Sequence, residues 1–554
     1  MSTQVEKLEA AIKAAIERAF AGHLLVGQIP AAIKLERPKD RDHGDYATSI
    51  ALQLAKPSGK NPREVAQIIC DQLAGTAGIS KVDIAGPGFI NITLDRANQA
   101  QLVTTILSSA QEYGKGNALA GVKINLEFIS ANPTGPLHLG HTRWAAVGDS
   151  LGRVLSAAGA EVTREFYIND RGNQMDLFGA SVEAAALGNP IPEDGYQGAY
   201  IADLAKEVVA SNPSIVALAE GQRHPAFREA AYSVQLKDQQ RVLDTFGTHF
   251  DVWFSERSLH DQGAVEHGLE KLRAQGHVFE EEGAIWLRTT DFGDDKDRVL
   301  TKSDGSLTYF SSDTAYYINK RERGFDICIY MLGADHHGYV GRLKAIAACA
   351  GDDPEYNIDV LIGQLVKIME GGEEVKLSKR AGTIITLEEL VDKVGVDAAR
   401  YTLIRYPVDT PMVMDIDILK RNTNENPVYY VQYAHARIAA VLRNAAELNI
   451  ALELKEFDSS QLSHDRENEL LGALAEYPRV VQSAAELRQP HRIARYLEEL
   501  AGTYHGFYAD CRVLPMGEEN PTPLHTARLL LCASTKQVIK NGLDLLGVSA
   551  PERM

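Results

Sequence analysis

The chain has 554 residues, a length that predicts three to four domains, and its 45% hydrophobic and 24% charged residues are typical of a globular protein. Disordered and fibrous classes are thereby excluded. No run of 18 apolar residues occurs, and the first ten positions carry charges where a signal peptide would need an apolar stretch. We therefore expect a cytoplasmic protein with no membrane segment.

Charge and cysteine content argue against further classes of protein. The five cysteines lie far apart and form no Cys-x-x-Cys pair, so neither a disulfide framework nor a zinc finger is expected. A net charge of −18 argues against non-specific coating of nucleic acid. The acidity lies in the centre, while residues 1–120 and 420–554 are each close to neutral and could present basic faces to a polyanion. Ordinary solvated surface explains the same charges more simply.

Residues 1–110 predict a small α/β module. Apolar residues recur at three- and four-residue spacing over 5–20, which indicates a helix with one apolar stripe. Asn61 followed by Pro62 is typical of a helix start, with a capping side chain and a proline in the first turn. Residues 90–94 alternate between apolar and polar as a strand does.

The middle of the chain predicts a parallel sheet. An alternating strand begins at Val122 and is followed by a Pro- and Gly-rich loop and a helix over 142–158. A second strand at 327–332 precedes a helix at 343–349. Strands that alternate with helices favour a doubly wound parallel sheet. About 150 mostly helical, charged residues separate the two units, and we interpret them as an insertion between half-folds.

The last 130 residues are predicted to be helical throughout. Asn426-Pro427 starts one helix, and Gly547 follows the last.

The stretch most informative about function runs from Glu127 to His141, from the end of a strand to the start of a helix. Ligands of doubly wound sheets bind beyond the carboxyl ends of the strands, and helix N-termini suit phosphate. His138 and His141 can donate hydrogen bonds to phosphate oxygens from one side, and Gly140 lets a base or ribose approach the backbone. The pattern predicts a nucleotide held for attack at its α-phosphorus.

Two simpler interpretations of the histidines remain. They could be a metal pair, although no Glu follows in His-Glu-x-x-His spacing and no third ligand is evident. They could also satisfy hydrogen bonds within a core. The preceding strand and Pro-x-Gly-Pro turn favour the nucleotide interpretation over both.

A second stretch, residues 374–383, is a short basic loop in an acidic region. Lysine is a mobile point charge that can follow a departing pyrophosphate, which suggests this task for Lys376 and Lys379. Alone, the loop is better explained as solvated surface. Its place in the chain, after the His-x-Gly-His motif and a second half-fold, favours the catalytic interpretation.

Together these stretches resemble the two signatures of class I aminoacyl-tRNA synthetases, and the wider match is to the arginyl-tRNA synthetase family. The resemblance includes Tyr167 to Gln174, Thr308 to Asp313 and Asn426 to Arg437, and it spans essentially the whole chain. Many members of this family lack the second lysine of the basic loop, which this sequence keeps as Lys379.

The resemblance implies the domain organisation. We expect an α/β fold: a class I Rossmann-type parallel-sheet catalytic domain with insertions, a small N-terminal α/β module and a C-terminal all-α helical domain. The expected boundaries are 1–115 for the module that contacts the tRNA elbow, 116–420 for the catalytic domain with a helical insertion at about 176–300, and 421–554 for the anticodon-binding domain.

The resemblance also implies the reaction. Arginine would attack the α-phosphorus of ATP, and the arginyl group would pass to the terminal adenosine of tRNA(Arg), at first to its 2′-hydroxyl. The expected partners are L-arginine, ATP with Mg²⁺, and tRNA(Arg), without a tightly bound cofactor, a protein-held metal or a membrane, in a monomer. The catalytic residues implied are His138, His141, Lys376 and Lys379, and the ATP site adds Gly140 and Ser378.

Recognition of arginine calls for carboxylates, because a guanidinium has five N–H donors and no acceptor. By resemblance, Glu127 and Asp313 face the guanidinium with Tyr309 beside them, and Asn132 lies near the α-amino and carboxylate groups. Tyr309 and Asp313 are four apart, so a helix that begins there would place them on one face. Without the resemblance, Asp313 would pass as a helix-start carboxylate, Tyr309 as core packing and Glu127 as an edge-strand charge.

The C-terminal helices offer stacking planes for RNA bases in Tyr429, Tyr430 and Tyr433, with Arg437 as a cation. A seam between helices that uses tyrosines for packing explains the same residues equally well.

Two other classes compete with an arginine–tRNA ligase. A small nucleotidyltransferase also uses His-x-Gly-His, but it needs neither the N-terminal module nor 130 helical residues after the basic loop. A non-catalytic RNA-binding relative would be expected to lack some of the two histidines and two lysines, all of which are present.

Overall fold

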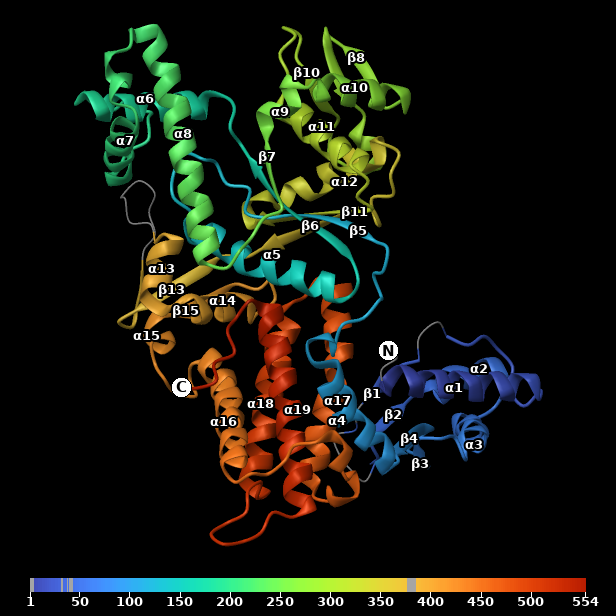
Figure 1. Ribbon diagram of the computed structural model, residues 1–554. Helices are drawn as coiled ribbons and strands as arrows, with labels where there is room; N and C mark the ends of the chain where they lie inside the picture. Colours follow the sequence, from blue (N-terminus) through green and yellow to red (C-terminus); the bar gives the residue numbers. More distant parts are fainter. Residues whose placement is uncertain (1–3, 31–32, 37, 39–42, 376–384) are drawn as a thin grey trace.

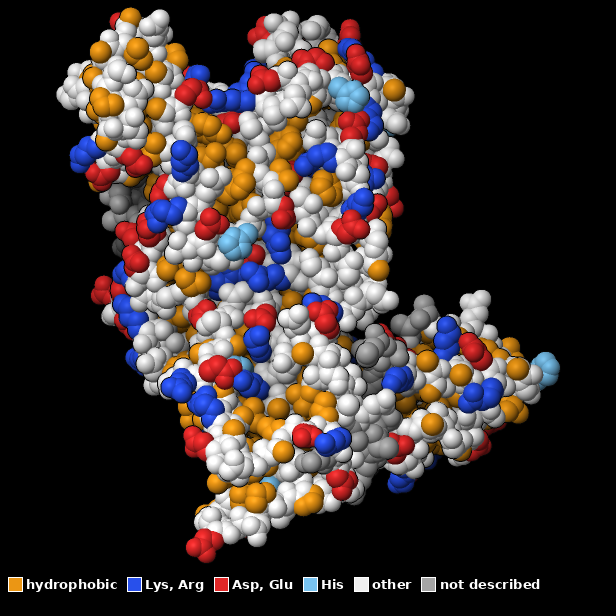
Figure 2. Space-filling model, in the orientation of Figure 1, with side chains coloured by type: hydrophobic (Ala, Val, Ile, Leu, Met, Phe, Trp, Pro, Cys, Tyr) orange, Lys and Arg blue, Asp and Glu red, His pale blue; other side chains and the backbone are white. Residues whose placement is uncertain are grey.

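The computed structural model describes residues 4–30, 33–36, 38, 43–375 and 385–554. It confirms the predicted fold class, with a parallel sheet at the centre, a small α/β module at the N-terminal end and a helical bundle at the C-terminal end (Figure 1). Two lobes rise beyond the central sheet, and the molecule is hollowed between them on the face shown in Figure 2. None of the described helices is long and apolar enough to cross a membrane.

The N-terminal module has a hydrophobic core of its own. Its four-stranded antiparallel sheet has the order β1-β2-β4-β3, and Ile12, Ile69 and Ile92 are fully buried between sheet and helices. The Asn61 side chain accepts the Glu64 N–H at 2.9 Å, so the predicted cap is present. The elements are α1 (Gln4–Ala21), β1 (Leu35–Glu36), β2 (Tyr46–Thr48), α2 (Ile50–Ser58), α3 (Pro62–Leu73), β3 (Ile79–Ala85) and β4 (Phe89–Leu94).

The central sheet contains five parallel strands in the order β12-β11-β5-β6-β7. The face of β5 that carries Ile124 and Leu126 packs in the core beneath α5, whereas Cys328 and Tyr330 of β11 pack in the core shared with α11 and α12. The carboxyl ends of β5 and β11 therefore lie together between the helices. The elements are β5 (Lys123–Glu127), α5 (Leu139–Ala157), β6 (Glu161–Ile168), β7 (Val252–Ser255), α11 (Tyr309–Glu322), β11 (Ile327–Gly333), α12 (Val340–Cys349) and β12 (Ile358–Gly363).

The segment expected to be a helical insertion, 176–300, is not helical throughout. Strand β7 within it pairs in parallel with β6 and completes the central sheet. Three further strands form an antiparallel sheet in the order β10-β9-β8. Only the three helices before β7 form a separate helical lobe, with its own small core. The elements are α6 (Asn173–Leu187), α7 (Ala199–Ser211), α8 (Glu220–Thr245), α9 (Glu256–Asp261), α10 (Ala264–Ala274), β8 (Val278–Glu281), β9 (Ala284–Leu287) and β10 (Arg298–Thr301).

The C-terminal bundle is helical as predicted, and it includes a helix from before the catalytic domain. Helix α4 packs against α19, and its Val103 and Ile106 are buried in the core of the bundle. The last helix ends at Gly547, whose positive φ favours glycine and where a Cβ would collide with the Arg400 guanidinium. The helices of the bundle are α4 (Arg96–Ser109), α16 (Pro427–Glu447), α17 (Asp465–Glu486), α18 (His491–Asp510) and α19 (Pro523–Leu546).

The described part of the chain between the central sheet and α16 forms a further three-stranded sheet in the order β14-β13-β15 and three helices. The elements are β13 (Val366–Glu370), β14 (Glu373–Glu374), α13 (Leu387–Val394), α14 (Val396–Ile404), β15 (Met412–Asp415) and α15 (Ile416–Leu419).

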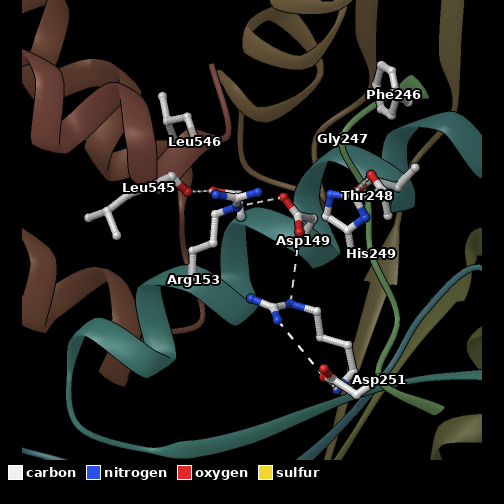
Figure 3. Close-up of polar contacts among 12 residues, drawn as sticks. Asp149, Arg153, Phe246, Gly247, Thr248, His249, Asp251, Leu545 and Leu546 are labelled. Atoms are coloured by element: carbon white, nitrogen blue, oxygen red, sulfur yellow. Dashed lines mark hydrogen bonds and ion pairs between the residues drawn. The ribbon is translucent and has the colours of Figure 1, made fainter. Parts of the chain in front are cut away.

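Polar contacts join the bundle to helix α5 (Figure 3). The Ser150 hydroxyl donates to the Leu545 carbonyl at 3.0 Å, and the fully buried Arg400 guanidinium donates to the Leu546 carbonyl at 3.1 Å and to Asp149 at 2.5 Å. Since a buried arginine must have its charge and its N–H groups satisfied, this junction has one well-defined geometry.

Candidate functional site

The chain turns sharply where β5 ends. Ile129 and Ser130 have φ values of 70° and 45°, which non-glycine residues rarely adopt, least of all a β-branched one. The Ser130 hydroxyl donates to Glu127 Oε1 at 2.9 Å and accepts the Tyr167 N–H at 3.2 Å. The serine thus holds the turn between the ends of β5 and β6 and orients the Glu127 carboxylate. Backbone strain of this kind is concentrated at functional sites.

The His-x-Gly-His motif forms the start of α5, as predicted. His138 caps the helix, its Nδ1 accepting the Gly140 N–H at 3.2 Å, while His141 Nδ1 accepts the His138 N–H at 3.4 Å. The two rings stack with centroids 4.0 Å apart. A nitrogen that accepts carries no proton, so in the neutral rings the proton is on Nε2, which can donate. A Cβ at Gly140 would lie 3.0 Å from His138 Cε1, so this glycine leaves room for the capping ring.

The described residues that follow the basic loop contact this motif, and the residue that precedes the loop pairs with β13. The Leu139 N–H donates to the Ile385 carbonyl at 3.1 Å, and the Leu387 N–H donates to the Leu137 carbonyl at 2.9 Å. On the other side, the Val375 N–H donates to the Ile368 carbonyl of β13. Lys376, Ser378 and Lys379, predicted to hold the triphosphate, lie outside the described residues.

An open cavity of about 1080 Å³ lies over the carboxyl ends of β5 and β11. Both motif histidines line it, together with Gly140, and so do the predicted arginine ligands Glu127, Asn132 and Asp313. A cavity with imidazoles at a helix start on one side and carboxylates on the other can hold a triphosphate and a cation next to each other.

The carboxylate of Asp313 lies on this cavity in the first turns of α11, where it accepts a hydrogen bond from the Tyr339 hydroxyl. The pKa of Asp313 is raised to about 6, chiefly by burial and to a smaller extent by the neighbouring charge of Glu127, while the hydrogen bond from Tyr339 opposes both. An ionised Asp313 is therefore costly until a cation binds, which is the property needed to select a charged ligand.

Glu127 has a partner that sequence reasoning missed. Its Oε2 lies 2.5 Å from the Nζ atom of Lys320, a side chain with 0% exposure two turns further along α11 than Asp313. The ammonium also lies over the rings of Tyr316, at 4.3 Å, and Tyr330, at 3.8 Å. The spacing of Asp313, Tyr316 and Lys320, at i, i+3 and i+7 on one helix face, was the available signal in the sequence.

The other predicted arginine ligands, Asn132 and Tyr309, differ in whether they line the cavity. The Asn132 amide donates to Gln174 Oε1 at 2.7 Å at the cavity wall. Tyr309 begins α11 as expected, but its side chain is 82% exposed and does not line the cavity. Of the histidine pair after β11, His336 lines the cavity and His337 does not.

The tyrosines of α16 pack along a seam and also remain accessible. Tyr429 and Tyr433 stack with centroids 6.0 Å apart, and Tyr430 packs against His505 of α18. Arg437 lies over the rings of Tyr433 and Tyr508. Tyr433 is exposed. Both interpretations of these residues, helix packing and base stacking, therefore fit the same arrangement.

Three family models match the chain one after another. Residues 6–94 match the arginyl tRNA synthetase N terminal domain, residues 102–437 the class I (R) tRNA synthetase catalytic domain, and residues 431–554 the DALR anticodon binding domain. The chain is 55% identical to an arginine–tRNA ligase of Pseudarthrobacter chlorophenolicus, over 99% of this chain and 100% of the relative. It is 56% identical to that of Renibacterium salmoninarum, over 99% and 98%.

Solved structures agree with the sequence comparisons. A Campylobacter jejuni protein described as an arginyl-tRNA synthetase superposes with a TM-score of 0.75 at 33% identity, over 83% of this chain and 100% of that one. The Thermus thermophilus arginyl-tRNA synthetase shares the fold, with a TM-score of 0.75 at 23% identity over 99% of both chains. The sheet, the His-x-Gly-His helix start and these matches define a class I aminoacyl-tRNA synthetase. Within that class, the chain belongs to the arginyl-tRNA synthetase family.

Proposed function

We propose that the cavity over β5 and β11 is the place where this arginine–tRNA ligase activates arginine. The observation that carries the proposal is that His138 and His141, at the start of α5, share one cavity with Asp313 and Glu127. A carboxylate oxygen of arginine attacks the α-phosphorus of ATP, the bond to the β-phosphate oxygen breaks, and pyrophosphate leaves. The 2′-hydroxyl of the terminal adenosine of tRNA then attacks the arginyl carbonyl and displaces AMP.

The histidines and lysines stabilise charge rather than form covalent intermediates. His138 and His141 donate from Nε2 to the triphosphate, and Gly140 leaves space for the nucleotide beside the backbone. Lys376 and Lys379, with Ser378, neutralise the departing pyrophosphate, which the anchoring of Leu139 to Ile385 supports. Magnesium enters as part of the ATP substrate, and the described residues contain no cluster of three potential ligands for a metal of their own.

Arginine is selected by Asp313 and Glu127, which accept from the guanidinium. Asn132 binds the α-amino and carboxylate end. The exposed Tyr309 side chain, whose hydroxyl lies near Gly172 outside the cavity lining, must turn inward to reach the amino acid. Closure of this kind would follow from substrate binding.

The tRNA would contact three parts of the chain. We keep the expected boundary between 420 and 421, but we end the N-terminal module near residue 94 instead of 115, because α4 packs in the bundle. The N-terminal module would hold the elbow, and the accessible ring of Tyr433 beside Arg437 would serve the anticodon loop. On the face shown in Figure 2, Lys and Arg side chains gather over α5, below the hollow between the lobes, where a phosphate backbone could pass. We expect the chain to act as a cytoplasmic monomer.

The proposal is tested by ATP–pyrophosphate exchange with each of the twenty amino acids, with and without tRNA. Exchange should depend on arginine and should be very slow without tRNA, because tRNA binding would complete the catalytic geometry. Robust exchange with another amino acid would refute the proposal. Exchange with arginine that does not need tRNA would refute only the coupling.

A further inference from the structure

We propose that Lys320 is a positioning residue that determines specificity for arginine, acting through Glu127 from beneath the floor of the cavity. The inference rests on the proposed function, since it concerns the same amino-acid site. Lys320 does not line the cavity and is completely buried, yet its ammonium lies 2.5 Å from a carboxylate oxygen that does.

The surroundings of Lys320 fix one position for its charge. The ammonium lies between the faces of Tyr316 and Tyr330, whose rings belong to the cavity lining, and it points at Glu127 Oε2. The other oxygen of Glu127 accepts from Ser130. Each carboxylate oxygen has two lone pairs, so one remains on each oxygen to accept from a substrate guanidinium.

Two of the three carboxylates Glu127, Glu165 and Asp313 around the floor already have a cationic partner. Glu165 of β6 is neutralised by Arg323, with contacts of 2.5 and 2.8 Å, and it also accepts from the Tyr316 hydroxyl. Lys320 neutralises Glu127 in the same way. Asp313 lines the cavity and has no ion pair among the described residues, so a bound guanidinium would supply its countercharge. The neighbouring Glu256, outside the cavity lining, adds to the negative potential there.

Removing Lys320 would change this charge arrangement. A buried carboxylate without a countercharge takes up a proton more readily, and a protonated Glu127 would present a donor to a ligand that has only donors. The side chains that face Glu127 come from three elements and the turn after β5. They are Lys320, Asp313 and Tyr316 of α11, Tyr330 of β11, Tyr167 and the register partner Glu165 of β6, and Ser130.

The test is Lys320→Met, measured as the KM for arginine and for ATP in tRNA-dependent pyrophosphate exchange between pH 6.5 and 8.5. At pH 6.5 the KM for arginine should exceed that of the parent by about tenfold or more. The ratio of the variant's KM for arginine to that of the parent should fall as pH rises and Glu127 loses its proton again. The KM for ATP should stay close to that of the parent, and discrimination against citrulline should weaken.

Arg321→Met is the matched control. Arg321 lies next to Lys320 on α11 and is also ion-paired, but to Asp352 at 2.9 and 3.0 Å, away from the cavity. The Arg321→Met change should lower thermal stability, but the ratio of its KM for arginine to that of the parent should not change with pH. If Arg321→Met reproduces the effect, or if Lys320→Met gives a ratio that pH does not change, Lys320 only supports the helix and the inference is wrong.

The double variant Glu127→Gln with Lys320→Met removes both charges and so avoids an unpaired buried group if the single variant does not fold. Its KM for arginine should be raised and the ratio to the parent should not change with pH. A double variant whose KM for arginine equals that of the parent would show that Glu127 does not act on the amino acid, which overturns the inference. A parent enzyme without arginine-dependent exchange would instead overturn the proposed function.

Discussion

The backbone amide of Gly140 and the imidazole of His138 form one unit at the start of α5. The N–H of the glycine donates to Nδ1 of the histidine at 3.2 Å, and the absence of a glycine side chain leaves space for the ring. The glycine of the His-x-Gly-His motif therefore has a role inside the protein, because it fixes the direction in which Nε2 of His138 points.

Gly140→Ala should therefore lower kcat by about 10- to 100-fold, because a Cβ 3.0 Å from His138 Cε1 displaces the ring. Thermal stability should be unchanged or higher, since alanine favours a helix over glycine by about 1 kcal/mol. Kinetics and thermal unfolding measured together check this. Gly221→Ala is the control, at the second residue of α8, where a Cβ meets nothing within 4 Å. Equal kcat in both variants would refute the role of the space at Gly140.

Asp313→Asn should reduce kcat/KM for arginine by at least about two orders of magnitude, because loss of one partner of a desolvated charge pair costs about 2–5 kcal/mol. The kcat/KM for citrulline should fall far less. In the parent, the KM for arginine should rise as pH falls through about 6, where Asp313 takes up a proton. This rise should be absent in the variant. A variant that still discriminates arginine from citrulline like the parent would show that Asp313 is only a helix-start carboxylate.

Lys379→Ala should lower kcat more than it raises the KM for ATP, because the charge on the departing pyrophosphate is greatest in the transition state. Steady-state exchange at several ATP concentrations measures both constants. The hydrogen bonds that join Ile385 and Leu387 to the His-x-Gly-His segment support the role proposed for Lys379. An unchanged kcat with only a raised KM for ATP would assign Lys379 to ground-state binding.

Deletion of residues 1–94 should raise the KM for tRNA by about tenfold or more and leave kcat at saturating tRNA near that of the full chain, since one of several linked contacts is lost. Deletion to residue 110 is not equivalent, because Val103 and Ile106 of α4 belong to the core of the bundle. This longer deletion should lower thermal stability strongly. A deletion of 1–94 that leaves the KM for tRNA unchanged would exclude a tRNA contact of the module.

Arg400→Met should destabilise the protein by about 3–5 kcal/mol, because it removes one partner of the buried pair with Asp149 and leaves several carbonyls without a donor. Chemical unfolding followed by circular dichroism measures this. The control is Arg495→Met. It removes an ion pair with Glu499, four residues further along α18, in which both side chains are exposed. That change should cost about 0.5 kcal/mol at most. Comparable losses in both variants would contradict a special role for Arg400.

Local patterns in the sequence predicted the elements that define the family. The parallel unit from β5 to α5, the cap at Asn61 and the end of the last helix at Gly547 each depend on residues close together in the chain. The turn between β8 and β9 was equally local and was overlooked. Glu282 and Gly283 both have positive φ in a two-residue hairpin loop, and an x-Gly pair between two short strand-forming segments is typical of such a loop.

Contacts between distant residues were not predictable in the same way. Lys320 and Glu127 are 193 positions apart, and nothing near either residue indicates the other. Strand β7 has only four residues, too few for periodicity to separate a strand from the surrounding helices. Exposure of Tyr309 likewise depends on how α11 lies against the cavity, which the helix face alone does not determine.

The junction between helix α5 and the bundle has a mechanical consequence for the site. It is one uninterrupted rod with His138 at its start and Asp149 about 16 Å further along its axis. Asp149 and Ser150 hold one part of the rod to the bundle, while the imidazoles lie at the other. Since close-packed interiors transmit displacement with little compression, a small tilt of the bundle moves the rings by a similar amount. With RNA on the bundle and nucleotide at the rings, as proposed above, both ligands would act on the same stiff helix, and each would then alter the affinity for the other by the same factor.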